Sequence, residues 1–265
     1  MKIGFIGTGN MGGALATAVS KVWDKSEILL ADFFPEKAKE LAEKLGAEAG
    51  SNAYLCENCE LVFLGVKPQV LPSVLAEIAP VVKKRKGALT LVTMAAGIPM
   101  ETVVRGIGEP VPVIRIMPNT PVSVGEGVVV YCTRDVAKDT EEAFQKALSQ
   151  AGLVEKIDEN KIDAASALHG CGPAFVYLFL EALADGAVSC GLPREVAVRF
   201  AAATAKGASQ MVLETGEHPA ALKDAVCSPG GTTIEGVRAL EEAGFRGAAM
   251  DAVIAAYDRT LELKK

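Results

Sequence analysis

Three glycines near the N-terminus have the spacing of a phosphate-binding turn. Gly7, Gly9 and Gly12 follow a short apolar run, residues 3–6, and precede a helical pattern. Gly7 permits a tight turn, Gly9 lets the backbone approach a pyrophosphate, and Gly12 lets the helix pack closely on the strand. Asp32 ends the next apolar run, 20 residues after Gly12. The pattern predicts a dinucleotide site, and the alternative is a glycine-rich turn that binds nothing.

A second loop places hydroxyl groups at the start of a helix. Pro229-Gly-Gly231 predicts a turn, and Thr232, followed three residues later by Glu235, predicts a capping box at a helix N-terminus. The hydroxyls of Ser228, Thr232 and Thr233 would then lie beside unpaired backbone N–H groups. Such a cluster of N–H and hydroxyl groups can bind a small carboxylate, although the same residues also suit a plain capping turn.

The elements around the first loop alternate between strand and helix. Residues 1–158 contain apolar runs separated by helical patterns; the runs are Ile3 to Ile6, Glu27 to Ala31, Leu61 to Val66, Ala88 to Met94, Val111 to Met117, Gly127 to Cys132 and Leu153 to Ile157. Runs without polar alternation are typical of strands covered on both faces. The order predicts an α/β domain, a Rossmann-like, doubly wound, mostly parallel sheet.

Ligands of such sheets bind at the carboxyl ends of the strands. Four segments are expected there: Gly7–Gly12, Val66–Pro68, Met94–Gly97 and Met117–Thr120. Small residues such as Ala95 and Ala96 let a planar ring or a ribose lie against the backbone. Each segment alone also suits an ordinary tight turn, but four in succession favour a cofactor groove.

The pattern changes after residue 158. From Glu159 to residue 265 no strand is expected, and an alanine-rich, all-α domain is predicted. The helix at Ala174 to Ser189 is apolar on nearly every side. A domain of this size can scarcely cover such a helix, so we expect another subunit to bury it, the alternative being a central helix of the monomer core.

Composition narrows the class of protein. The chain has 265 residues, half of them hydrophobic, and a net charge of −6. The one basic cluster, Lys83–Lys86, suits a solvated helix end, so a nucleic-acid partner is not expected. We expect no membrane span and no signal peptide, hence a cytoplasmic protein. Six scattered cysteines fit a reduced compartment. Cys56 and Cys59 are expected to be incidental thiols rather than a redox pair, and no metal site is expected.

The segment Leu222 to Glu241, LKDAVCSPGGTTIEGVRALE, resembles the signature of the Δ1-pyrroline-5-carboxylate reductase family. Further motifs resemble that family in the same order, and the resemblance covers essentially the whole chain; they are Phe5-Ile-Gly-x-Gly9, Val66-Lys-Pro68, Ala95-Ala-Gly97, Met117-x-Asn-Thr-Pro121, Gly170-x-Gly172-Pro173, Ala182-Leu-Ala-Asp-Gly186 and Gly191-Leu-Pro193.

The resemblance implies a reductase that passes hydride from NADPH or NADH to the C5=N bond of 1-pyrroline-5-carboxylate, giving L-proline in the last step of proline biosynthesis. It implies an active site at a homodimer interface of interlocked helical domains, with some members forming decamers. It also assigns the cofactor to a set of residues: Ile6, Gly7, Thr8, Gly9, Asn10, Met11, Gly12, Asn52, Val66, Lys67, Pro68, Met94, Ala95 and Ala96.

The same resemblance assigns the substrate carboxylate to Ser228, Gly231, Thr232 and Thr233, and places Glu159 close to the substrate. Hydride adds more readily to a protonated imine, so a hydroxyl near the nitrogen, for which we choose Thr233, would donate or relay the proton. A carboxylate at Glu159 would stabilise the cationic imine.

The residues allow more than one cofactor and more than one function. Asp32 stands where many family members carry serines that bind a 2′-phosphate; its carboxylate favours NADH, yet Lys37 could reach a phosphate. The alternative functions are an imine reductase or β-hydroxyacid dehydrogenase-like enzyme, and a non-catalytic dinucleotide-binding regulator. The hydroxyacid enzymes rely on a catalytic lysine early in the interdomain helix, and no lysine occurs here between Lys161 and Lys206. The second anion-binding loop, Ser228 to Thr233, counts against a non-catalytic regulator, which has no need of it.

Overall fold

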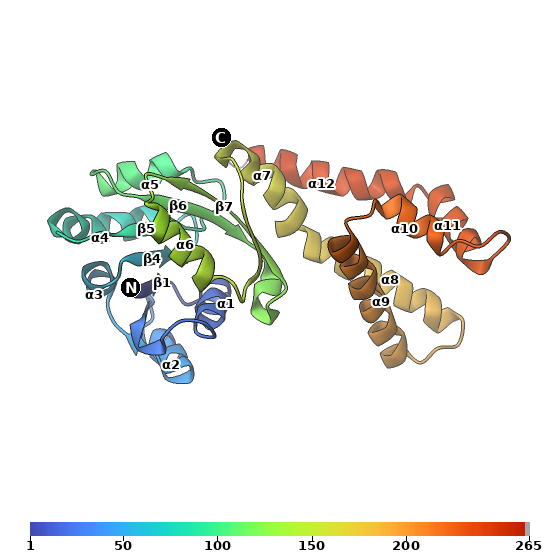
Figure 1. Cartoon of the computed structure of the whole chain (residues 1–265), viewed down its shortest axis with the longest axis horizontal. Coiled ribbons are helices and arrows are strands. Elements are labelled where there is room, and N and C mark those ends of the chain that lie inside the picture. Colours follow the sequence, from blue (N-terminus) through green and yellow to red (C-terminus); the bar gives the residue numbers. More distant parts are fainter. Residues whose placement is uncertain (263–265) are drawn as a thin grey trace. The chain divides into compact units, whose positions relative to one another are not determined.

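The computed structural model describes residues 1–262, which form two compact units (Figure 1). The first unit contains residues 1–170 together with the C-terminal residues from Tyr257, and the second contains Cys171–Ala256. Each unit is described by itself.

An eight-stranded sheet forms the centre of the first unit. Its spatial order is β3-β2-β1-β4-β5-β6-β7-β8, with every neighbouring pair parallel except β6 and β7. The strands are β1 (Ile3–Ile6), β2 (Ile28–Ala31), β3 (Glu48–Ala49), β4 (Leu61–Leu64), β5 (Thr90–Thr93), β6 (Val113–Pro118), β7 (Gly127–Arg134) and β8 (Gly152–Lys156). This order confirms the predicted doubly wound, mostly parallel sheet.

Helices cover both faces of this sheet (Figure 1). One face packs against α3 (Asn52–Asn58), α4 (Leu71–Lys84) and α5 (Met100–Ile107), the other against α1 (Asn10–Val19), α2 (Pro35–Leu45) and α6 (Lys138–Ala147). Successive residues of one strand therefore enter different cores; Leu64 joins the first and Phe63 the second. Burial on both faces explains why the strand sequences are apolar without alternation.

The sequence did not predict several short elements of the first unit. The strand β3 has two residues, and α3 begins directly after Ser51, whose side chain caps it. The remaining elements are 3₁₀ turns η1 (Lys25–Glu27), η2 (Thr120–Val124) and η3 (Glu159–Lys161), the helix α7 (Ile162–Ala165) and a π-helical turn η4 (Ser166–Gly170). Elements of so few residues carry too little periodicity to be recognised in a sequence.

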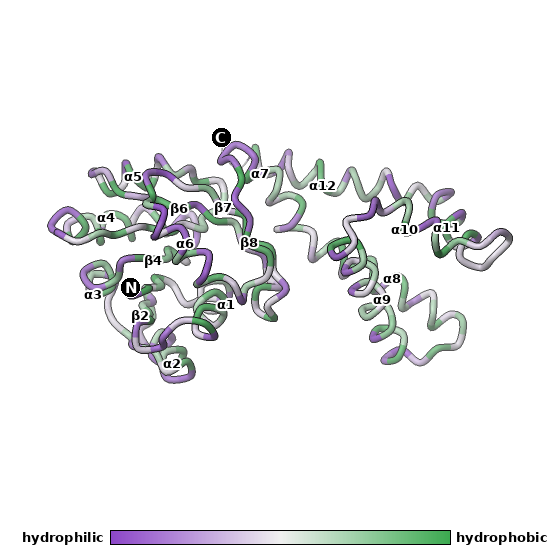
Figure 2. Tube along the Cα trace, viewed as in Figure 1, coloured by the Kyte–Doolittle hydropathy of each residue, from purple (hydrophilic) through white to green (hydrophobic). Residues whose placement is uncertain are grey.

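The second unit contains helices without any strand among its residues, as predicted. Its helices are α8 (Gly172–Ser189), α9 (Arg194–Thr215), α10 (Pro219–Ala225), α11 (Thr232–Glu242) and most of α12 (Phe245–Glu262). Apolar residues occur along α8 with little interruption (Figure 2). Only Ala184 of α8 is buried, while Tyr177 and Leu178 are more than 60% exposed. The alternative of a core helix buried within this chain is therefore wrong.

One helical stretch, Glu159–Ser189, is long and apolar enough to cross a membrane by length and composition alone. No such segment was expected from the sequence, because no uninterrupted apolar run approaches the ~20 residues that a membrane span requires. The structure continues the helical backbone through His169 and the Gly172-Pro173 pair by means of the π-helical turn. Almost none of the apolar window is buried within this chain.

Candidate active site

The glycine turn lies at the carboxyl end of β1, as predicted. Gly7 has a φ of 96°, a conformation that favours glycine, and its N–H donates to the Ala31 carbonyl at 2.8 Å. A methyl group on Gly12 would overlap the carbonyl oxygen of Gly7. The close approach that Gly12 permits is therefore between helix α1 and the turn itself, rather than between the helix and the strand.

Gly9 is the N-cap of α1, and no side chain caps this helix. Nothing in the structure lies within 4 Å of the place where a side chain on Gly9 would begin. The space in front of the helix N-terminus is therefore open, and a Cβ would fill it. Open space beside uncapped N–H groups fits the pyrophosphate of a dinucleotide.

Asp32 ties the end of β2 to the glycine turn. Its Oδ2 accepts from the Thr8 N–H at 2.8 Å and from the Thr8 hydroxyl at 3.0 Å, and its Oδ1 accepts from the Phe34 N–H at 3.0 Å. Burial by itself would raise the pKa of Asp32, but the hydrogen bonds from Phe34 and Thr8 outweigh it and the pKa lies below its usual value. Asp32 is therefore a carboxylate at neutral pH.

The other segments assigned to the cofactor follow neighbouring strands. Val66, Lys67 and Pro68 come after β4, and Met94 to Gly97 come after β5, which lies beside β4. Because β1, β4, β5 and β6 are parallel neighbours, their following segments meet at one edge of the sheet. Asn52 starts α3 next to this edge, and its amide donates to Glu77 Oε2 at 3.0 Å.

Arg115 is a buried residue of the site that the sequence analysis missed. It stands in the middle of β6, its side chain is 2% exposed, and its guanidinium lies 3.3 Å from Glu159 Oε1 and 3.3 Å from Asp163 Oδ1. The same Glu159 oxygen accepts from the N–H of Met100 at the start of α5 at 2.8 Å. Glu159 therefore fastens β6 to the segment that follows β5. An arginine inside an apolar run was the available signal.

His169 and Asn119 form a second contact that the sequence analysis missed. The His169 ring has Nδ1 at 2.6 Å from the Ala165 carbonyl oxygen and Nε2 at 2.9 Å from that of Met117. Asn119 donates to the His169 carbonyl at 2.9 Å and accepts from the Val128 N–H at 2.8 Å. The π-helical turn thus holds the end of β6, and such turns frequently occur at functional sites.

The predicted carboxylate-binding residues share one turn of the second unit. Gly230 has a φ of 66°, the Gly231 N–H donates to the Ser228 carbonyl at 3.0 Å, and α11 begins at Thr232. The predicted capping box is wrong: Gly231, in extended conformation, is the N-cap, no side chain caps the helix, and Glu235 pairs with Arg238. The hydroxyls of Thr232 and Thr233 are consequently not used in capping.

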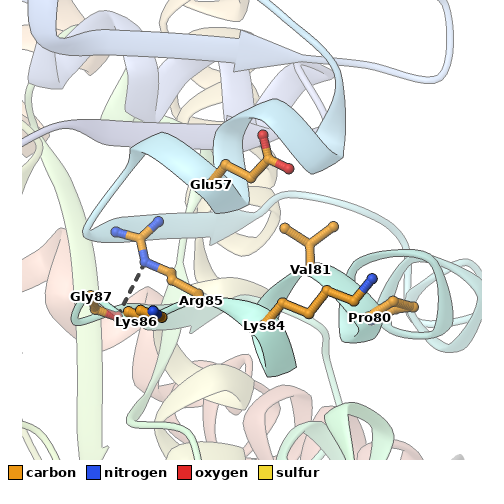
Figure 3. Close-up of a pocket in the computed structure, with 7 residues that line it drawn as sticks. All are labelled: Glu57, Pro80, Val81, Lys84, Arg85, Lys86 and Gly87. Atoms are coloured by element: carbon orange, nitrogen blue, oxygen red, sulfur yellow. Dashed lines mark hydrogen bonds between the residues drawn. The ribbon is translucent and has the colours of Figure 1, made fainter.

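The basic cluster lies away from this edge, at the amino ends of the strands. Arg85 precedes β5 and lines a hollow of about 440 Å³ together with Glu57, Val81 and Lys84 (Figure 3). Its guanidinium donates to the carbonyls of Cys56, Gly87 and Ala88. Arg85 therefore holds main chain together, whereas Lys83, Lys84 and Lys86 are exposed, as expected of a solvated helix end.

The thiols of Cys56 and Cys59 are both buried, and burial raises the pKa of each to about 12. Such thiols carry almost no thiolate at neutral pH and are poor nucleophiles and metal ligands. Within residues 1–262, no group of three or more His, Cys, Asp and Glu side chains is placed to hold a metal ion.

Comparison with known proteins identifies the family. The chain is 39% identical to the pyrroline-5-carboxylate reductase of Methanosarcina acetivorans, over 100% of this chain and 98% of the relative, and 38% identical to that of Escherichia coli with the same coverage. The chain belongs to the pyrroline-5-carboxylate reductase family. It is accordingly an oxidoreductase that acts on a C=N bond with NAD(P)H.

Family models match both parts of the reductase. The one described as pyrroline-5-carboxylate reductase dimerisation matches residues 159–263, and the one described as NADP oxidoreductase, coenzyme F420-dependent, matches residues 2–97. The dimerisation match includes the exposed apolar helix α8, which supports a homodimer.

Solved structures agree with the family in fold. A pyrroline-5-carboxylate reductase from Coxiella burnetii superposes with a TM-score of 0.92 at 31% identity, covering 100% of this chain and 98% of that one. The Plasmodium falciparum pyrroline carboxylate reductase with NADP bound gives a TM-score of 0.86 at 32% identity, with the same coverage.

Proposed function

We propose that this chain transfers hydride from a nicotinamide cofactor to the C5=N imine of 1-pyrroline-5-carboxylate, giving L-proline, the last step of proline biosynthesis. The proposal rests on one observation: the segments that follow β1, β2, β4 and β5 lie at the same edge of the sheet, and the space at Gly9 is open. The relatives named above, matched over the whole chain, add support from their printed names.

The glycine turn, residues 6–12, would hold the pyrophosphate through backbone N–H groups, and Asp32 and Asn52 would contact the adenosine. The segments Val66–Pro68 and Met94–Ala96 would flank the nicotinamide and its ribose. The cofactor supplies the hydride when bound. The residues around it supply orientation, which contributes much of the rate in such reactions.

In this proposal the turn from Ser228 to Thr233 binds the substrate carboxylate. It offers the Gly231 backbone, an uncapped helix N-terminus and three exposed hydroxyls, all without a cation. Thr233 donates or relays a proton to the imine nitrogen, which makes C5 more electrophilic towards hydride. Glu159 contributes negative charge on the substrate side, and its side chain, 35% exposed, is held by Arg115.

Exchange of Thr233 for alanine tests the proton role. We expect Thr233→Ala to lower kcat with NAD(P)H affinity unchanged, because the cofactor residues lie elsewhere in the sequence. Thr232→Ala is the matched control and is expected to raise KM for the imine more than it lowers kcat. An unaltered kcat in Thr233→Ala would remove this hydroxyl from the mechanism.

Turnover tests the reaction itself. Purified protein should oxidise NADH or NADPH when 1-pyrroline-5-carboxylate is added, with proline formed in equal amount. A folded, cofactor-binding protein that oxidises neither would favour the imine-reductase or regulator alternatives.

The proposal includes the organisation of the chain. It places a dinucleotide-binding domain at residues 1–158 and a helical substrate-binding and dimerisation domain at 159–265, interlocked with its partner and assembled as dimers or decamers. The exposed apolar side chains of α8 support burial by a partner. The six free cysteines suit a cytoplasmic location. Light scattering of the purified protein distinguishes dimer from decamer.

A further inference from the structure

A hollow of about 440 Å³ lies beside the end of β2, and its charged lining residues are two carboxylates and one lysine. Its walls include Asp32, Phe33, Lys39, Asn52 and Glu77. It borders the glycine turn, because Asp32 is hydrogen-bonded to Thr8. In the proposed function this hollow faces the adenosine half of the cofactor, and the inference below rests on that function.

The two carboxylates of the hollow have different surroundings. Asp32 is fixed by the N–H groups of Thr8 and Phe34, so its position at the strand end does not depend on a ligand. Glu77 accepts from the amide of Asn52, which leaves its negative charge uncompensated by a cation in that contact. A phosphate brought into the hollow would meet both charges.

The nearby lysines are already engaged. Lys39 forms an ion pair with Glu36 at 3.0 Å, and Lys37 lies over the ring of Phe34 at 5.0 Å from its centroid. Lys37 is not part of the hollow's lining. The sequence left open that Lys37 could bind a 2′-phosphate; its ammonium lies over the Phe34 ring, and its charge helps to lower the pKa of Asp32.

Phe33 supplies an apolar surface at the same hollow. Its side chain is 89% exposed and meets Phe34 edge to face at a centroid distance of 5.1 Å. An exposed aromatic face of this kind can stack on a purine ring.

We propose that this chain prefers NADH to NADPH: Asp32 accepts from the 2′-hydroxyl of the adenosine ribose, Phe33 offers a face to the adenine, and Asp32 with Glu77 repels a 2′-phosphate. A hydroxyl donates to a carboxylate favourably, whereas a phosphate near −2 charge is repelled by it. The Plasmodium relative carries bound NADP, so this preference belongs to the side chains of the hollow and not to the fold.

Binding without turnover tests the inference. The probes are NAD⁺ and NADP⁺, and their adenosine fragments 5′-AMP and 2′,5′-ADP, titrated by calorimetry into the intact protein. We expect NAD⁺ to bind at least about tenfold more tightly than NADP⁺. Because the repulsion is electrostatic, this ratio should narrow as NaCl rises from 0.05 to 0.5 M.

Variants separate charge from stacking. Asp32→Asn keeps a side chain that can accept from Thr8 but removes the charge, and should shift the NAD⁺/NADP⁺ affinity ratio about tenfold towards NADP⁺. Glu77→Gln should shift it in the same direction by a smaller factor. Phe33→Ala should weaken both dinucleotides by the same factor and leave the ratio unchanged.

Equal affinity for the two dinucleotides, or an affinity ratio unmoved by Asp32→Asn and by salt, would overturn the inference. Its failure is distinguishable from failure of the proposed function. Proline formation with NADPH preferred would overturn the cofactor preference alone, whereas absence of proline formation with either cofactor would overturn the function.

Discussion

Replacing Arg115 by methionine should unfold this protein at a markedly lower temperature. The guanidinium is 2% exposed and lies 3.3 Å from both Glu159 and Asp163. Methionine has a similar length and is apolar, so it fills the space without the charge. The substitution leaves two carboxylates close together beside the sheet, one of them, Asp163, only 9% exposed.

The expected size follows from this geometry. At 3.3 Å and an effective dielectric of about 20, each ion pair contributes roughly 5 kcal/mol before desolvation is counted. Desolvation cancels much of that sum, and removal of one partner from a buried pair costs about 3–5 kcal/mol. The buried Nε of Arg115 has no hydrogen-bond partner, so removing it relieves a desolvation penalty and lowers the net destabilisation. We therefore expect the lower value, about 3 kcal/mol.

Thermal unfolding by circular dichroism measures the effect. For a chain near this size about 3 kcal/mol corresponds to a fall in Tm of about 6–12 °C. Wild type and variants must be compared at one protein concentration, because dimer stability depends on concentration. Arg115→Lys should fall between wild type and Arg115→Met, since one ammonium cannot match two carboxylates as a guanidinium does.

A surface pair provides the control. Lys138 and Glu142 lie 3.4 Å apart and are 87% and 60% exposed, so Lys138→Met should cost less than about 1 kcal/mol. If Arg115→Met melts within 2 °C of Lys138→Met, the charges around Arg115 do not hold β6 to the segments after it, and the reasoning is refuted.

Three further results are expected. Gly12→Ala should lose NAD⁺ binding in calorimetry while keeping helical circular dichroism, and a dissociation constant within twofold of wild type would contradict the steric argument. The pKa of the buried Cys56 and Cys59 thiols is about 12 in the folded protein against 9.0 ordinarily, so the folded state holds protons that the unfolded state releases. The free energy of unfolding in urea should therefore fall as pH rises from 9 towards 12, with a smaller fall in a Cys56→Ala/Cys59→Ala variant; equal falls would contradict it. His169→Ala removes the ring that lies between the Ala165 and Met117 carbonyl oxygens, one of which accepts its N–H, and should cost about 1–3 kcal/mol in urea unfolding; a change below about 0.5 kcal/mol would count against the contact.

Local rules explain why the glycine turn and Asp32 could be predicted. The requirement for a positive φ at Gly7 and for contact at Gly12 lies within a few residues of chain, and the strand–turn–helix context is equally local. The edge shared by the segments after β4 and β5 could be predicted too, because parallel strands present their carboxyl ends together.

Contacts between residues far apart in the chain could not be predicted from local sequence patterns. Arg115 is 44 residues from Glu159, and nothing in either segment specifies the other. His169 acts through a π-helical turn, which has no recognised sequence signature. At Thr232 the local rule itself was misapplied, because Gly231 in extended conformation takes the N-cap position that the hydroxyl was expected to occupy.

The contacts of the glycine turn also constrain how this sequence can change over time. Gly12 rests on the Gly7 carbonyl, while a Cβ on Gly7 or on Gly65 would come within 2.7 Å of the other's carbonyl oxygen. Any one replacement forces backbone to move at a second glycine, so no single substitution offers a neutral first step. Variation should therefore accumulate more readily at Phe33, whose side chain is 89% exposed. A lineage carrying this turn can exchange one dinucleotide for the other far more easily than it can abandon dinucleotides.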